Sequence, residues 1–117
     1  MAQIDTHRSN ISRKRSELAK LSQDRAKEST KISSQQQKIA SAKRILSSTK
    51  SQSTMKSKLN EIKRAEEEIA KINKKIADFD SKIAKKDKEI ADEEKRYRQE
   101  EQKELWKILA ARLEVMN

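Results

Sequence analysis

The chain contains no cysteine, no glycine and no proline, and each absence excludes a class of protein. Without cysteine there is no disulfide scaffold, zinc ribbon or thiol nucleophile. Without glycine there is no phosphate-cradling loop of the kind that nucleotide enzymes use. One Trp, one Tyr and one Phe cannot fill the core of an ordinary globular domain. The sequence has no apolar run that could form a transmembrane segment and no signal-peptide core, so we expect a cytoplasmic protein.

What remains is a highly charged chain of 117 residues. Charged side chains make up 41 % of it, and 29 Lys and Arg against 19 Asp and Glu give a formal net charge of +10. A chain rich in Lys, Glu, Ala and Arg is typical of a coiled coil, but low hydropathy with high charge is also typical of disorder. The spacing of the apolar residues decides between the two.

Large apolar residues recur at every seventh position in two stretches, 4–46 and 55–97, with Arg25 as the one exception. A disordered chain has no reason to keep this spacing, which is the a column of a left-handed coiled coil. The d positions are poorer, so the predicted seam is narrow and partly polar. The predicted core residues of the hairpin or oligomer are Ile11, Leu18, Leu21, Ile32, Ile39, Ile62, Ile69, Ile72, Ile76, Phe79, Ile83 and Ile90.

The two stretches do not share a frame, because Leu46 and Met55 are nine positions apart instead of seven. The residues between them are mostly Ser and Thr, which favour caps and turns over helix interiors. We therefore predict a helix over 3–47, a bend over 48–53 and a second helix over 54–115. The alternative is one helix with a frame shift and no bend. The expected fold class is all-α, an antiparallel helical hairpin or coiled coil forming one module over 1–117 with a longer second helix.

The flanking charges fit an antiparallel arrangement. One flank of the first helix is basic or neutral, and the facing flank of the second is acidic or neutral. Pairing residue numbers that add to 102 places Arg8 opposite Glu94 and Arg15 opposite Asp87, while core partners add to 104. An antiparallel dimer satisfies the same sums, so the sequence leaves both arrangements open.

The second helix is longer than the first and continues past it into the most apolar stretch of the chain. An unpaired apolar face is usually an association site. It could pack in a homo-oligomer, dock on a separate partner or downstream domain, or lie on a membrane surface. The predicted association residues are Leu105, Trp106, Ile108, Leu109, Leu113 and Met116.

The first arm carries most of the excess positive charge, with 12 Lys and Arg against 4 Asp and Glu in residues 1–50. Arg13, Lys20 and Lys27 recur at sevens and form a possible contact for a polyanion. His7 is expected to be a tolerated polar layer. The acidic runs 66–68 and 92–94 are expected to be solvated faces, because consecutive helical residues diverge. We therefore predict no catalytic residue, metal ligand or cofactor.

The segment 44–64 resembles the N-terminal coiled-coil module that precedes the TIR domain of many bacterial TIR proteins. In that family a Ser/Thr-rich stretch is followed by a Ser-Thr-x-x-(Ser/Thr)-Lys-x-x-Glu-Ile run and then a Lys/Glu-rich coiled coil. The matching residues of this bend motif are Ser53, Thr54, Ser57, Lys58, Glu61 and Ile62. The remainder of the chain is similar to the family only in style.

The resemblance implies a helical oligomerisation module of a bacterial immune protein, in which the coiled coil brings together TIR domains that cleave NAD or make signalling nucleotides. This chain has no TIR domain, so NAD cleavage does not carry over. Either it is a fragment of a longer protein, or it is a free-standing version of the module. In both cases Met1 is expected to be a genuine start, and the sequence leaves the C-terminal end open. The first hypothesis is thus a non-enzymatic oligomerisation or adaptor module that binds itself or a TIR effector. The alternatives are a small basic nucleic-acid-binding protein and a helical chaperone or secretion partner.

Overall fold

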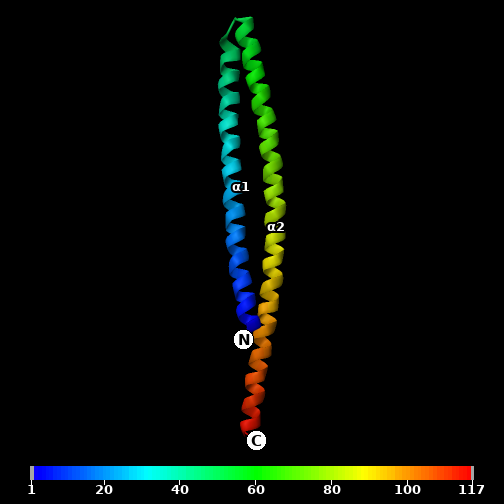
Figure 1. Ribbon diagram of the computed structural model, residues 1–117. Coiled ribbons are helices and arrows are strands. Elements are labelled where there is room, and N and C mark those ends of the chain that lie inside the picture. The colour runs from blue at the N-terminus through cyan, green and yellow to red at the C-terminus, as the bar shows by residue number, and fades with distance from the viewer. Residues whose placement is uncertain (1, 117) are drawn as a thin grey trace. The chain divides into compact units, whose positions relative to one another are not determined.

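The computed structural model describes residues 2–116, and all of them are helical except for a turn over 49–51. Helix α1 comprises Ala2–Ser48 and helix α2 comprises Gln52–Met116. The two pack against each other as an all-α helical hairpin, which confirms the predicted fold class (Figure 1). The predicted bend over 48–53 is longer than the observed turn, because Ser48 still belongs to α1 and Gln52 already belongs to α2.

Hydroxyl side chains close the end of α1 without glycine. The Thr49 N–H donates to the Ile45 carbonyl at 2.9 Å and so completes the last helical turn. The Ser47 and Ser48 hydroxyls donate to the Arg44 carbonyl at 2.7 Å and 3.4 Å. These bonds give partners to carbonyls that a helix end otherwise leaves to water. No described residue has a positive φ angle, so the turn needs no left-handed residue.

The start of α2 is capped by Ser51. The Thr54 N–H donates to Ser51 Oγ at 3.3 Å, which is the geometry of an N-cap serine three residues ahead of its donor. The Met55 N–H donates to the Ser51 carbonyl at 3.0 Å and begins the regular helix. The Ser51 N–H in turn donates to Thr49 Oγ1 at 3.2 Å. The Ser/Thr composition of the segment is therefore explained in large part by helix capping.

The hairpin consists of two compact units, and each is described by itself. The turn unit comprises Leu21–Ser81, and the end unit comprises residues 2–20 and 82–116. In the turn unit the buried side chains are Ala42, Ala65 and Ile72. Two of the three are alanines, so this seam is narrow, as the weak d column predicts.

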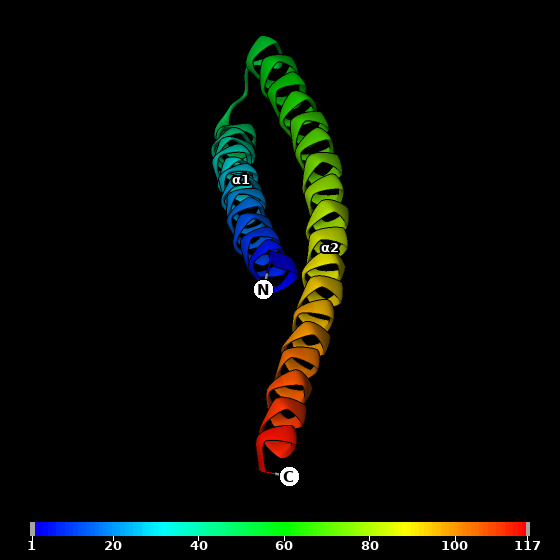
Figure 2. The ribbon, with the colours of Figure 1, turned by 60° about the horizontal axis from the view of Figure 1, so that its bottom comes forward.

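In the end unit, residues of α1 pack beside α2, and the buried residues are Ile11, Ile90 and Glu93. A carboxylate thus takes a place in the seam that an apolar side chain usually fills. Helix α2 continues past the start of α1 into residues 105–116, which we call the tail (Figure 2). No helix in the described part of the chain has a stretch long and apolar enough to cross a membrane.

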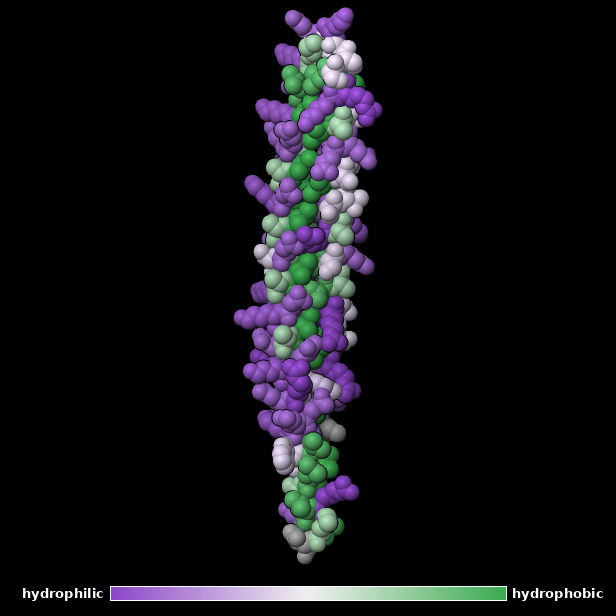
Figure 3. Space-filling model, turned by 180° about the vertical axis from the view of Figure 1, so that it is seen from behind, coloured by the Kyte–Doolittle hydropathy of each residue, from purple (hydrophilic) through white to green (hydrophobic). Residues whose placement is uncertain are grey.

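The predicted heptad columns are the positions that the hairpin removes from water. All a and d positions from Ile4 to Thr49 and from Met55 to Glu100 are buried or half-buried. All twelve predicted core residues are among them. Figure 3 shows strongly apolar side chains along the seam and again over the tail, with hydrophilic and weakly polar side chains over most of the remaining surface.

Removing the cap should destabilise the hairpin. We expect Ser51→Ala to lower the free energy of unfolding by about 1 kcal/mol, because the N–H groups at the start of α2 lose an acceptor. Urea unfolding followed by circular dichroism measures the change. Ser53→Ala is the matched control, two residues along the same helix, and an equal loss in both variants would contradict the assignment of Ser51 as the cap.

The seam depends on its few fully buried apolar side chains. Ile72 is 2 % exposed, whereas Leu59 in the same unit is 58 % exposed. We expect Ile72→Ala to lower the free energy of unfolding by about 2–4 kcal/mol through lost burial and a new cavity. Leu59→Ala should change it by less than about 0.5 kcal/mol. Equal effects in chemical denaturation would show that the seam does not carry the stability.

Candidate functional site

The most buried charged group among the described residues is the carboxylate of Glu93, whose residue is 6 % exposed. His7 Nδ1 of α1 lies 2.7 Å from Glu93 Oε2. Two cations lie near Oε1, Lys14 Nζ at 3.9 Å and Arg96 Nη1 at 3.6 Å. A carboxylate removed from water is tolerated only when charge and hydrogen bonds replace its hydration, and these three groups supply both. We call them, with Glu93, the Glu93 cluster.

The cluster stabilises the ionised form of Glu93. The hydrogen bond from His7 is the main cause that holds the pKa of Glu93 below its ordinary value, and the charges of Lys14 and Arg96 act in the same direction. Burial acts in the opposite direction but is the smaller effect. His7 is thus a polar layer of the seam, as predicted, and the structure adds the partner that the sequence analysis missed.

A second ion pair lies beside this cluster in the end unit. Lys86 Nζ contacts Glu17 Oε2 at 2.6 Å and Glu89 Oε2 at 3.2 Å. The bond from Lys86 lowers the pKa of Glu17, and Glu17 in turn raises the pKa of Lys86. Lys86 occupies a core position, so its flexible chain carries the ammonium group out of the seam to the carboxylates.

The predicted orientation pairs Arg8–Glu94 and Arg15–Asp87 are not the pairs that form. Arg15 Nη2 donates to Glu94 Oε1 at 2.6 Å, seven residues beyond Asp87. Arg8 instead donates to the Tyr97 hydroxyl at 3.1 Å, and its guanidinium lies 5.8 Å from the ring centroid. The prediction treated each side chain as reaching its nearest opposite position. The arginine chain is long enough to reach one heptad further, and the Tyr97 ring offers Arg8 a cation–π contact.

In the turn unit, sequence reasoning missed the pairing of Arg25 with Asp80. Arg25 is the one polar residue in the apolar column, and its Nε donates to Asp80 Oδ1 at 2.5 Å. Asp80 belongs to the acidic flank of the second helix, and this position could have indicated its pairing with Arg25. Nearby, Glu28 pairs with Lys31 through Oε1, while its buried Oε2 has no hydrogen-bond partner. The unpaired Glu28 oxygen lowers the stability of this unit, which opposes the stability gained by apolar burial in the seam.

Within residues 2–116, the tail is the one segment in which exposed large apolar side chains gather. Elsewhere in the described chain such side chains occur singly, at Ile45 and Leu59. All six predicted association residues are exposed, and Val115 adds a seventh. An open groove begins beside the start of α1 and continues onto the tail. It is lined by Ile4, Asp5, Arg8, Tyr97, Arg98, Glu101, Gln102, Glu104, Leu105 and Ile108.

The remaining predicted residues are found on exposed faces, except for Thr54 and Lys58, which are half-buried. Among the three cations predicted to contact a polyanion, Arg13 Nε lies 3.7 Å from Glu17 Oε1. The other two, Lys20 and Lys27, are exposed. In the bend motif, Lys58 pairs with Glu61 at 3.2 Å. Ser53, Thr54 and Ser57 lie in the first turns of α2. Within residues 2–116, no group of three or more His, Cys, Asp or Glu side chains is arranged to hold a metal ion.

The Glu93 cluster makes the hairpin sensitive to acid. A carboxylate whose pKa is lowered on folding adds stability above its unfolded value, here 4.5, and that stability is lost as the pH falls through the folded value. We expect the thermal midpoint to fall between pH 6 and about pH 3, and to fall less in Glu93→Gln. Glu17 titrates in the same direction and should leave the variant a residual dependence.

The matched control is Glu66→Gln, which changes an exposed carboxylate on the same helix. Its melting profile should follow that of the parent chain at every pH. Identical pH dependences in Glu93→Gln and the parent would contradict the role given to the cluster.

Comparison of the chain with protein-family models, with curated proteins and with solved structures found no match. The resemblance to the coiled-coil module of TIR proteins therefore remains a prediction from residues 44–64.

Proposed function

We propose that the chain is a non-enzymatic helical association module, and that the tail of α2 binds another protein chain. The observation that carries this proposal is the gathering of seven exposed large apolar side chains within residues 105–116. Leu105 is 55 % exposed and Trp106 is 69 % exposed, although both are residues that folding normally buries.

The distribution of these side chains around the helix supports a protein partner. Polar residues in the tail are limited to Lys107, Arg112 and Glu114. A helix that is apolar on most sides is normally buried by its neighbours. Full burial of one such side chain contributes about 1.5–3 kcal/mol, whereas an exposed ion pair contributes about 0–1 kcal/mol. Burying the tail against another chain would therefore contribute more stability per side chain than an exposed ion pair does.

Self-association is the first form of the proposal, because the groove beside Tyr97 and Leu105 continues the surface on which α2 already packs a helix. A helix of a second copy would follow α1 along the same side of α2. The second form is docking of an effector protein, and a bacterial TIR protein as that effector is supported by the sequence resemblance alone.

A substitution in the tail should change the size of the assembly. We expect the parent chain to sediment as an oligomer and Leu105→Asp to sediment as a monomer at the same concentration, because a buried carboxylate without a partner opposes association. Sedimentation equilibrium, or light scattering coupled to gel filtration, measures the mass.

The matched control is Leu59→Asp, which replaces a leucine that is 58 % exposed and stands outside the tail. It should keep the parental mass, and circular dichroism should show both variants equally helical. If the parent is a monomer, self-association is wrong. If Leu105→Asp leaves an oligomer unchanged, the tail is not its interface.

A further inference from the structure

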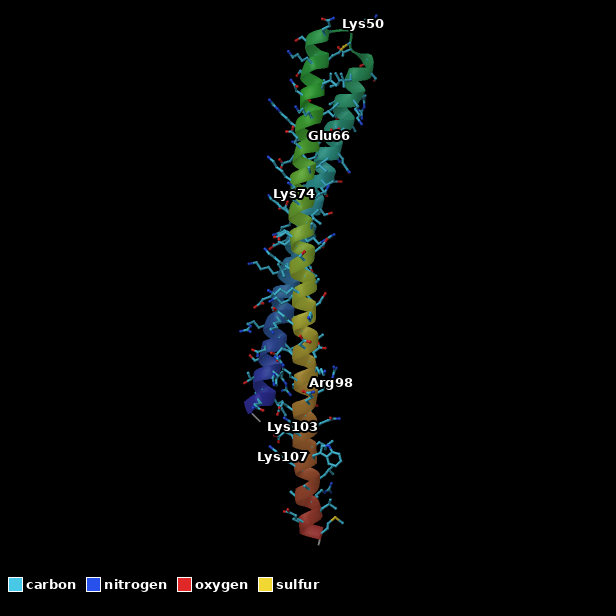
Figure 4. All side chains as sticks on the ribbon, turned by 90° about the vertical axis from the view of Figure 1, so that its right-hand side faces the viewer. Lys50, Glu66, Lys74, Arg98, Lys103 and Lys107 are labelled. Atoms are coloured by element: carbon cyan, nitrogen blue, oxygen red, sulfur yellow. The ribbon has the colours of Figure 1, made fainter. Side chains whose placement is uncertain are left out.

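The excess positive charge of the chain is concentrated around the turn. Residues 43–64, which we call the tip, contain seven Lys and Arg and one acidic residue, Glu61, which is a balance of +6. The whole chain has a net charge of +10, so these 22 residues hold more than half of it. Lys50 lies at the turn itself (Figure 4). After Glu61, the next acidic residue along α2 is Glu66, which lies beyond the tip.

These cations are not used to hold the hairpin together. Lys58 is engaged by Glu61. The other six cations of the tip are exposed and form no ion pair within the described residues. They are Lys43, Arg44, Lys50, Lys56, Lys63 and Arg64. Three cations outside the tip, Arg15, Arg25 and Lys86, are paired with carboxylates of the other helix. The tip thus has a surplus of positive charge that no carboxylate among residues 2–116 neutralises.

One face of α2 within the tip combines these cations with neutral hydrogen-bonding side chains. A shallow hollow on this face is lined by Ser53, Lys56, Ser57, Asn60, Glu61 and Arg64. Lys56 and Lys63 are seven residues apart, and so are Ser57 and Arg64, so each pair lies along one side of the helix. The first turn of α2 contains no acidic residue, so its N-terminal dipole is not neutralised by a side chain.

Lysine, arginine, serine and asparagine side chains near a helix N-terminus are the groups that bind phosphate oxygens of nucleic acids. We propose that the tip binds the phosphate backbone of a duplex nucleic acid without reading its sequence. Single strands are disfavoured because residues 43–64 contain no aromatic side chain on which a base could stack.

A lipid surface offers phosphates too, but it fits the tip less well. A helix that lies on a bilayer inserts its apolar face between the headgroups. In the tip, Met55 and Ile62 of α2 are half-buried in the seam. The exposed large apolar side chains there, Ile45 and Leu59, stand singly on different helices and form no continuous apolar face. Apart from these two side chains the free surface of the tip is polar, and a polar surface requires a ligand that presents closely spaced charges on its own surface, as a duplex does.

The test is binding of the full chain to a fluorescent 20-base-pair duplex, followed by anisotropy over a range of salt concentrations. The tip variant carries Lys56→Glu, Lys63→Glu and Arg64→Glu. The matched control carries Arg13→Glu, Lys20→Glu and Lys27→Glu on α1, which changes the net charge by the same amount. We expect the parent affinity to fall steeply with salt, and the tip variant to bind at least about tenfold more weakly than the control.

Each outcome supports the proposal or overturns it. A selective loss in the tip variant, with the same helix content as the control, supports the tip as the contact. A selective loss in the control moves the contact to α1, and equal losses indicate attraction by net charge alone, so both overturn the proposal. Absence of duplex binding by the parent also overturns it, as does tighter binding to phosphatidylserine vesicles than to the duplex.

Discussion

The hairpin depends on a narrow seam that is formed by the a and d columns and is only partly apolar. The a column supplies isoleucines and leucines almost without interruption, but the d column supplies His7, Lys14, Glu28, Lys58, Lys86 and Glu93 as well as apolar residues. Each polar side chain placed there must find a partner or reach water, because desolvation without compensation costs more than the apolar neighbours contribute. Most of the hydrogen bonds and ion pairs between the helices provide partners for these polar side chains or for their neighbours.

The two units differ in how the polar side chains of their seams are paired. In the end unit, Glu93 collects His7, Lys14 and Arg96, so a carboxylate takes the place of a core side chain and ties three turns of helix together. In the turn unit the buried residues are apolar, and Arg25 extends from its core position to Asp80 at the side of the seam. The pairing of Glu28 is incomplete, because its buried Oε2 has no hydrogen-bond partner. Apolar burial therefore supplies the stability, while the polar contacts restrict the register.

The sequence was informative where a repeated pattern summed many weak signals. Fourteen positions at intervals of seven indicated both helices and the face that each buries, and the Ser/Thr segment located the turn to within a few residues. The individual ion pairs were predicted wrongly, because a column assignment gives the position of a Cα atom and says nothing of how far an arginine reaches. The partners of His7 and Arg25 were missed for the same reason. The exposure of the tail was predictable, since an apolar stretch lay beyond the reach of the shorter helix. Its occupant is a property of another molecule, and no pattern within this chain specifies it.

The three-residue turn has a consequence for the order in which the hairpin forms. Its closing bonds join residues three or four apart, whereas the Arg25–Asp80 bond joins residues 55 apart and the His7–Glu93 bond residues 86 apart. The entropy lost on closing a loop grows with its length, but each layer formed shortens the loop that the next must close. The helices should therefore zip from Ser51 outward, layer by layer, and the Glu93 cluster should be among the last contacts made. A chain of this kind folds rapidly for its length, because at every step the contact to be made is already local.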